Sequence, residues 1–468
     1  MPPREQAQPL VVAGVSGLSG AARSAERRPP GPIRWRSSLR NTIYDVLSSK
    51  KDWVETESET EWDFFWADKG WIHHELDKMH LNDWQRINHF PNHYELTRKD
   101  LLIKNLKRAK KQLEREDRHA EAAQYNFFPL TFVVPSEYRM FVEEFKRSQG
   151  TWIMKPIGKA QGQGIFLFNK LSQISDWRRD HTWRPDDEEA PETYLAQRYV
   201  DAPYLVGGKK FDLRIYALVT SYSPLRVFLY RSGFARFTNA RYSMKKEDIT
   251  NTFIHLTNVA IQKHAPGFDV AKGMKWSIRS LRAFMTTRHG AEASNELFHN
   301  MQNLIIRALL AVQPAMINDK HCFELYGYDI LIDQALKPWL LEVNASPSLS
   351  ASDKADFVLK FAMLEDVLDI VDMEGKREPS AKVDLHMGGF DLIWDGAPVL
   401  RFDKPTSLPT MLGAYNDRDR NQLRSQNEGS NSDAKAGPQR AARPTQAVAA
   451  ALPTAGGSDA AVAATSLF

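Results

Sequence analysis

The most informative segment of this sequence is MKPIGKAQGQGI, residues 154–165. Lys155 ends a run typical of a β-strand, Gly158, Gly162 and Gly164 follow, and a second β-type run comes after them. Glycines let a backbone approach a phosphate closely, and the lysine supplies a cation beside it. No Gly-Lys-Ser/Thr follows, and the loop leads into a strand rather than a helix, which excludes a Walker A loop and a dinucleotide fingerprint. The segment predicts a phosphate-binding loop between two strands, with an ordinary hairpin as the alternative.

The composition indicates a folded protein of more than one domain. The chain has 468 residues, of which 42% are hydrophobic and 11% aromatic, enough for a large core. Its 62 basic and 58 acidic residues leave a net charge of +4, so it has no polyelectrolyte character. The single cysteine, Cys322, favours a reducing compartment, and no apolar run is long enough for a transmembrane helix. We expect neither nucleic-acid binding nor membrane insertion.

The two ends of the chain differ in composition from its centre. Residues 1–32 are rich in Pro, Ala, Gly and Arg, and residues 427–468 contain 13 alanines and one aromatic residue. Segments with so little large apolar surface cannot offset the entropy of ordering them, so both are predicted to be disordered. The predicted folded parts are an N-terminal α/β domain at 33–135, the domains that carry the chemistry at 136–375, and a C-terminal extension on or near the core at 376–426.

The centre of the chain alternates β-type runs with helical patterns. Residues 211–222 and 225–237 are long alternating runs, which predict a β-hairpin. The other predicted elements are strands at 152–155, 164–168, 194–200, 323–332 and 339–343, and helices at 278–289, 294–313 and 352–371. The predicted class is therefore α+β with a substantial antiparallel component.

A long helix is predicted at 97–123, with Thr97 as its N-cap. Residues 98–111 within it carry seven basic side chains against a single acid, Asp100. A run this dense suits an acidic partner, and a solvated helix face is the alternative.

Carboxylates stand among apolar neighbours at two predicted strands near the end of the folded part. Glu342 and Asn344 are two residues apart and share a strand face, and Asp329 lies on what should be the adjacent strand. Two carboxylates and an amide oxygen are hard ligands suited to Mg²⁺ that bridges nucleotide phosphates. Because a buried unpaired carboxylate is costly, either a metal ion or a cationic side chain must accompany these acids.

Three further groups of polar residues are weak signals one by one and gain weight together. They are KKFDLR at 209–214, HLTN at 255–258, and the cations Arg236 and Lys275.

Taken together, these motifs resemble the tubulin tyrosine ligase-like family, whose members have an ATP-grasp fold and use ATP to add amino acids to tubulin. The resemblance covers about residues 34–400. It rests on KP at 155–156 with QGQGI at 161–165, GKKFDLR at 208–214, HLTNVA at 255–260 and LEVNASP at 341–347. Within the family, HFPNHYELTRK at 89–99 and DKHCFELYGYD at 319–329 resemble the polyglutamylase branch.

The resemblance implies a role for each motif. Arg236 and Lys275 match cations that bind the incoming glutamate, and Arg214 would support the reacting carboxylate. A second glutamine, Gln163, stands where relatives commonly have a basic residue. The implied magnesium ligands are Asp329, Asn344 and Glu342, the last also counted as catalytic with Arg214. The implied ATP site has four parts. The phosphates would be held by Lys155 and Lys210, under a glycine lid made of Gln161, Gly162, Gln163, Gly164 and Ile165. The adenine would bind a hinge strand made of Gln197, Arg198, Tyr199 and Val200, and the polar residues Asp212, Thr257 and Asn258 would complete the site.

The implied function is an ATP-dependent tubulin polyglutamylase. It would join a glutamate side chain of a tubulin C-terminal tail to the amine of free glutamate through an acyl phosphate, with ATP and Mg²⁺ as cofactors. The implied partners are tubulin or microtubules, free glutamate and accessory complex subunits, and the implied location is the cytoplasm and cytoskeleton, including ciliary axonemes and basal bodies. A small-molecule ATP-grasp ligase and a non-catalytic microtubule scaffold are the alternatives. A protein kinase would need His-Arg-Asp and Asp-Phe-Gly segments, which the sequence lacks.

Overall fold

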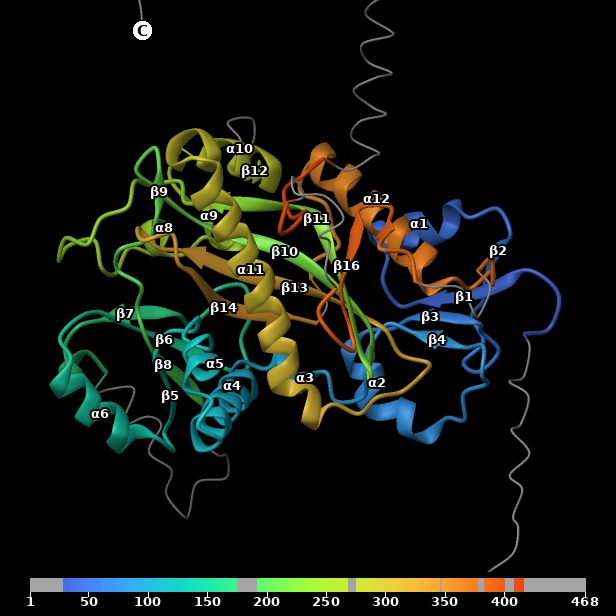
Figure 1. Cartoon of the computed structure of the whole chain (residues 1–468), viewed down its shortest axis with the longest axis horizontal. Coiled ribbons are helices and arrows are strands. Elements are labelled where there is room, and N and C mark those ends of the chain that lie inside the picture. The colour runs from blue at the N-terminus through green and yellow to red at the C-terminus, as the bar shows by residue number, and fades with distance from the viewer. Residues whose placement is uncertain are drawn as a thin grey trace, which may run out of the picture. The chain divides into compact units, whose positions relative to one another are not determined.

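The computed structural model describes residues 28–174, 192–267, 275–345, 347–377, 383–399 and 408–415 (Figure 1). The predicted disordered ends lie outside the described residues, apart from residues 28–32. The described part is α+β, as predicted, with helices packed on three β-sheets. The domain boundaries stay predictions. Of the helices described, none is both long enough and apolar enough to cross a membrane.

The N-terminal sheet is parallel and has four strands. Its order is β2 (Trp53–Glu55), β1 (Ile33–Ser37), β3 (Phe64–Trp66) and β4 (Arg86–Ile87). Its helical connections are α1 (Thr42–Ser49), α2 (Lys69–Glu75) and the 3₁₀ turn η1 (Leu76–Lys78). Asn41 caps α1, and Trp35, Trp53 and Phe64 pack with the apolar side of that helix.

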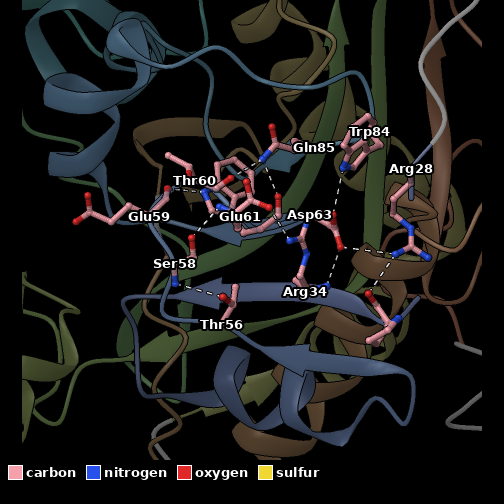
Figure 2. Close-up of polar contacts among 12 residues, drawn as sticks. Arg28, Arg34, Thr56, Ser58, Glu59, Thr60, Glu61, Asp63, Trp84 and Gln85 are labelled. Atoms are coloured by element: carbon pink, nitrogen blue, oxygen red, sulfur yellow. Dashed lines mark hydrogen bonds and ion pairs between the residues drawn. The ribbon is translucent and has the colours of Figure 1, made fainter. Parts of the chain in front are cut away.

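A buried carboxylate ties β1 to β3 in this sheet (Figure 2). Asp63, 1% exposed, accepts hydrogen bonds from the Arg34 backbone N–H at 2.8 Å and from Trp84 Nε1 at 3.1 Å. The guanidinium groups of Arg28 and Arg34 lie 3.6 and 3.4 Å from its oxygens. Through these contacts Asp63 anchors the start of the described chain to the sheet.

The second sheet is small and antiparallel. Its order is β5 (Thr131–Val134), β8 (Tyr194–Arg198), β6 (Trp152–Pro156) and β7 (Phe166–Phe168), with the 3₁₀ turn η2 (Leu171–Ile174) after β7. Helix α6 (Tyr138–Arg147) covers one face, where Phe141 packs on Trp152 and Met154. The alternate residue Ile153 packs on the other face, with Tyr199 and Leu256. One face is therefore core, and the other is left for the site.

The third sheet is antiparallel and has eight strands. Its main path is β14 (Pro338–Asn344), β13 (Glu324–Ile332), β10 (Lys209–Tyr222), β11 (Leu225–Phe237), β16 (Phe390–Asp395) and β15 (His386–Met387), with β9 (Leu205–Val206) on β10 and β12 (Lys275–Ser277) on β11. The hairpin predicted at 211–222 and 225–237 is confirmed as β10–β11, and the predicted strands near 323–332 and 339–343 are β13 and β14.

Helices cover both faces of this large sheet. They are α10 (Ile278–His289) and α11 (Ala291–Val312), which is followed by the 3₁₀ turn η4 (Gln313–Ala315), and α12 (Lys354–Val371) (Figure 1). Leu213 and Ile215 of β10 belong to the core that contains α10 and α11. Tyr216 and Leu218 belong to the core that contains α12. The alternation of β10 thus places one strand in two cores.

The prediction of one long helix at 97–123 is wrong in two respects. It is divided into α4 (Lys99–Arg115) and α5 (His119–Ala123), with Asp117 between them at φ 56°, in the left-handed region. Thr97 is not an N-cap, because it ends a separate helix, α3 (Tyr94–Thr97), and its hydroxyl donates to the His93 carbonyl at 3.1 Å. Leu102 and Leu106 of α4 are buried, as the helical pattern predicts. Among the described residues, the remaining short helices are α8 (Thr252–His255) and α9 (Val259–Gln262).

Candidate functional site

A cavity lies between the small sheet and the large sheet. Strands β6 and β8 line it from one side, and β10, β13 and β14 line it from the other. The loop after β6 and the segment after α8 complete its wall, and Lys99 reaches it from the start of α4.

Most of the predicted nucleotide and metal residues line this cavity together. They are Lys155, Gln161, Gly162, Ile165, Gln197, Arg198, Tyr199, Val200, Lys210, Asp212, Thr257, Asn258, Asp329 and Glu342. Gln163 and Gly164 belong to the same loop, and neither lines the cavity; the same holds for Arg214 and Asn344. Arg236 and Lys275 line a second cavity, of about 400 Å³, and Thr257 lines both.

Two buried lysines face the first cavity from opposite sheets. Lys155 Nζ donates to Gln197 Oε1 at 2.6 Å, and Lys210 Nζ donates to the Tyr199 hydroxyl at 3.0 Å and the His255 carbonyl at 2.8 Å. Among the described residues neither lysine forms an ion pair within 4.0 Å, although each is less than a tenth exposed. Burial lowers the pKa of Lys155 to about 8 and that of Lys210 to about 7. An anionic ligand between them would restore their full charge.

The acids beside these lysines belong to a network with two arginines. Arg214 Nε and Nη2 donate to the two oxygens of Asp329, at 2.5 and 3.1 Å. Arg236 donates to Asp212 at 2.8 Å through Nε, and its Nη2 also lies 2.8 Å from Asp329 Oδ2. Burial would raise the pKa of Asp329, but the charges of Arg214 and Arg236 outweigh it and hold that pKa well below its usual value. Two arginines and two carboxylates form a neutral, ionised cluster.

The three predicted metal ligands lie on neighbouring strands. Asp329 of β13 is directly opposite Glu342 of β14, and Asn344 is opposite Gly327. Glu342 is partly exposed, and its Oε2 lies 3.4 Å from Lys99 Nζ. Asn344 Nδ2 donates to the Gly327 carbonyl at 3.3 Å. Within the described ranges, no group of three or more His, Cys, Asp or Glu side chains is arranged to hold a metal ion, and the predicted set has only two such residues.

The loop after β6 folds onto the segment that precedes α9. Gln161 and Gly162 have φ values of 60° and 83°, in the left-handed region that favours glycine. A Cβ atom on Gly162 would lie 2.4 Å from Ile261 Cδ1 and 3.1 Å from Asn258 Oδ1. Gly162 is therefore required for the close approach of this loop to the far wall of the cavity.

His255, Lys99 and Asp356 are among the contributors to the two cavities that the sequence interpretation missed. His255 lies in a motif that was singled out, yet its contact with Tyr199 OH at 3.0 Å joins segments far apart in the chain. Burial lowers the pKa of His255 to about 4, so it is neutral near pH 7. Lys99 was given no role in the site. Asp356 of α12, which binds Lys275 at 3.0 Å, had no sequence signal at all.

Comparison with known proteins gives consistent results. A family model described as "Tubulin-tyrosine ligase family" matches residues 76–380. The "Probable tubulin polyglutamylase TTLL9" of Rattus norvegicus is 48% identical over 441 residues, covering 86% of this chain and 94% of the relative. The "Probable tubulin polyglutamylase ttll-9" of Caenorhabditis elegans is 46% identical, covering 80% and 87%. The "Probable alpha-tubulin polyglutamylase Ttll1" of Tetrahymena thermophila is 45% identical, covering 78% and 93%.

Proposed function

The chain belongs to the tubulin-tyrosine ligase family, and we propose that it is an ATP-dependent tubulin polyglutamylase with an ATP-grasp fold. It joins the side-chain carboxylate of a glutamate in a tubulin C-terminal tail to the amine of free glutamate. Its relatives named as tubulin polyglutamylases match most of its length and support the catalytic reading over a scaffold.

The observation that carries this proposal is the pair of lysines that face one cavity from two β-layers. Lys155 comes from the small sheet and Lys210 from the large sheet. Both ammonium groups are buried and lack an ion pair among the described residues, so the protein retains them at a cost in folding free energy. A nucleoside triphosphate supplies the negative charge that these two groups lack, and its phosphates could contact both lysines, which come from opposite sheets.

The chemistry of amide formation explains why such a site is needed. A free carboxylate does not react with an amine at neutral pH, because the leaving group would be an oxide. Transfer of the γ-phosphoryl group of ATP to the tail carboxylate releases ADP and gives an acyl phosphate. The deprotonated amine of glutamate attacks the carbonyl carbon of the acyl phosphate, and the tetrahedral intermediate expels inorganic phosphate as the amide forms. Lys155 and Lys210 neutralise phosphate charge, and the loop at 157–165 closes the cavity against water that would hydrolyse the acyl phosphate. Arg214 contacts Asp329 rather than the cavity, so we assign it to holding that carboxylate in place.

Asp329 and Glu342 are the residues that would hold Mg²⁺, with Asn344 beside them. The donor set suits the ion, because all three offer hard oxygen atoms and the two carboxylates are directly opposite on adjacent strands. Both carboxylates line the same cavity as the two lysines. When bound, Mg²⁺ neutralises phosphate charge and orients the phosphoryl group that is transferred. The protein's contribution is to keep Asp329 ionised through its two arginines.

The second cavity is the proposed site for the incoming glutamate. Its wall carries Arg236 and Lys275, and it adjoins the nucleotide cavity at Thr257. Two cations suit an amino acid that has a second carboxylate, since its amine must stay free to attack. This arrangement favours glutamate over neutral amino acids as the substrate.

Helix α4 offers the surface that we assign to the acidic tubulin tail. Its basic residues are not equivalent, because Lys99 pairs with Glu342 and Lys107 pairs with Glu137 at 3.2 Å. The residues that are exposed at helical spacings of three and four are Lys104, Arg108, Lys111 and Arg115. We call these four the α4 stripe. They share one side of a helix whose first residue lines the nucleotide cavity.

The most direct test is mass spectrometry of tubulin tails after incubation with the full chain, microtubules, ATP, Mg²⁺ and one amino acid at a time. We expect glutamyl additions with glutamate only, and we expect Glu342→Gln, which removes a proposed metal ligand, to abolish them while the far-UV circular dichroism stays unchanged. Microtubule binding without additions would favour a scaffold. ATP consumption with free amino acids but not with tubulin would favour a small-molecule ligase.

The proposed location is the microtubule cytoskeleton. Tubulin as the substrate puts the chain on microtubules, and we extend this to ciliary axonemes and basal bodies on the basis of the resemblance to the polyglutamylase branch. Imaging of the tagged chain in ciliated cells tests the extension, and staining confined to cytoplasmic microtubules would contradict it.

A further inference from the structure

A cluster of three charged side chains stands at the edge of the second cavity. Asp356, 6% exposed, lies in the first turn of α12. Its Oδ2 accepts hydrogen bonds from Lys275 Nζ at 3.0 Å, from Lys360 Nζ at 3.0 Å and from the Ser352 backbone N–H at 3.0 Å. Lys275 Nζ also donates to Ser352 Oγ at 2.6 Å.

The two lysines of this cluster differ in their access to the cavity. The side chain of Lys275 is 21% exposed, lines the cavity and lies over the ring of Phe234, with 4.6 Å from Nζ to the ring centroid. The side chain of Lys360 is 4% exposed and does not line the cavity, and its Nζ also donates to the Ser350 carbonyl at 2.7 Å. Of these two lysines, only Lys275 can therefore touch a ligand in the second cavity.

The charge of the cluster explains why two lysines share one carboxylate. Two lysines and Asp356 leave one net positive charge, whereas Arg236 belongs to the neutral network with Arg214 and two aspartates. Asp353 also lines the cavity, but its side chain is exposed, so solvent and salt screen its charge. Without Lys360, Asp356 would cancel the charge of Lys275 and the cavity would lose its attraction for an anion.

We propose that Asp356 and Lys360 are positioning residues for the incoming amino acid. Asp356 holds the Lys275 ammonium in place, and Lys360 neutralises Asp356 so that the charge of Lys275 remains available to a carboxylate of the substrate. The benefit is one of preorganisation, because a long lysine side chain otherwise loses conformational freedom when the ligand binds. This inference rests on the proposed function, since it takes glutamate as the ligand of the second cavity.

The test is calorimetric titration of the full chain with glutamate in the presence of a non-hydrolysable ATP analogue. Lys360→Met removes the neutralising charge, and Asp356→Asn removes the hold on Lys275 while it raises the net charge. We expect Lys360→Met to weaken glutamate binding about fivefold to twentyfold, the size of one lost charge interaction in a partly exposed site. We expect Asp356→Asn to weaken it as well, because the lost placement of Lys275 outweighs the gain in net charge. Affinity for the ATP analogue should stay within about twofold. Lys360→Arg keeps the charge and should restore glutamate affinity to within about threefold of the wild-type value.

A matched control comes from the same helix. Asp369→Asn breaks the pair of Asp369 with Lys50, at 3.7 Å, which is remote from both cavities, and should leave glutamate affinity unchanged. A purely structural role for the cluster predicts a lower melting temperature of Lys360→Met with unchanged glutamate affinity, and that result would overturn the inference.

The outcomes separate this inference from the proposed function. Glutamate binding that responds to the cluster variants, without any addition to tubulin, would remove the proposed function and keep the inference. If the chain adds glutamate to tubulin but its glutamate affinity does not respond to the Asp356 and Lys360 variants, the proposed function stands and the inference is overturned. No glutamate binding by the wild-type chain would overturn both.

Discussion

The two cavities of this protein hold their cations in opposite ways. In the cavity between the sheets, Lys155 and Lys210 are buried with neutral hydrogen-bond partners, and burial lowers their pKa values to about 8 and about 7. In the second cavity, Arg236 and Lys275 are both bound to carboxylates. The first arrangement suits a ligand with several negative charges, which can replace the missing counter-charge. The second suits the two carboxylates of glutamate, for which accurate placement of each cation matters more than an excess of positive charge.

The largest expected effect is a loss of stability when Arg236, the ion-paired arginine of the second cavity, is replaced. Among the described residues, Arg236→Met would leave Asp212 without an ion-pair partner and Asp329 with only Arg214. Breaking a buried ion pair by removing one partner costs about 3–5 kcal/mol, so we expect the free energy of unfolding to fall by that amount. Urea denaturation followed by circular dichroism measures it. Unchanged stability would mean that the network is not held together by its charges.

Replacement of Lys210, which has no ion-pair partner among the described residues, should not lower stability. Lys210→Met removes a buried charge whose desolvation opposes folding, so stability should be equal or higher. Activity should fall at least about hundredfold, because a cation on the transferred phosphate is lost. Urea denaturation and the rate of glutamate addition provide the two readouts. A variant that is unstable and active would reverse the contrast between the cavities.

Proton uptake sharpens the same contrast. Because the pKa values of Lys155 and Lys210 lie near 8 and 7, both groups lose protons in the free protein as pH rises through that range. Phosphates favour the charged forms, so binding of the ATP analogue should take up little proton at pH 6 and up to about two protons at pH 8.5. Titration calorimetry in buffers of different ionisation enthalpy measures the uptake, and Lys210→Met should reduce it. Uptake that is equal at the two pH values would contradict the assignment.

The same pKa values fix the sign of the pH effect on stability. An unfolded lysine has a pKa of about 10.4, so the unfolded chain binds more protons than the folded chain between about pH 7 and pH 10. The contribution of these two lysines to the free energy of unfolding therefore rises with pH across that window. In Lys210→Met the rise should be smaller.

The smallest expected effect lies outside both cavities, on the α4 stripe. Reversing Lys104, Arg108 and Lys111 to glutamate should weaken microtubule binding several-fold at low salt and flatten its salt dependence, because screened surface charges act over about 10 Å. Cosedimentation with intact and tail-cleaved microtubules measures it, and the tail-cleaved sample should show little difference. The matched control reverses the exposed Arg139, Lys146 and Arg147 of α6. Equal losses in the two triple variants would indicate a general charge effect.

Local sequence patterns predicted the elements that carry the site. The alternating runs at 211–222 and 225–237 gave the hairpin that places Lys210, Asp212 and Arg214 on one strand, because alternation follows directly from burial on a sheet. The strands that carry Asp329 and Glu342 were predicted to be adjacent, which is confirmed, whereas the register that sets the two residues opposite each other was not predicted. The break of the long helix at Asp117 was missed, since a single left-handed residue leaves no mark in the apolar period.

Contacts between distant segments were beyond a reading of the sequence. Lys99 was not predicted to belong to the site, yet it pairs with Glu342. Asp356 and Lys275 are 81 residues apart, and their meeting depends on how α12 packs against the large sheet. Such contacts are set by the packing of whole layers, for which neither periodicity nor spacing carries a signal.

Strand β10 has a consequence for motion. Its residues belong to two cores at once, and Lys210, Asp212 and Arg214 occupy the same strand. Amide hydrogens of β10 should therefore exchange with solvent only when the whole fold opens, whereas those of the loop at 157–165 should exchange through local fluctuations. The site residues on the large sheet are therefore expected to stay fixed. The movement that admits and releases the nucleotide in each turnover must come from the small sheet and its loop.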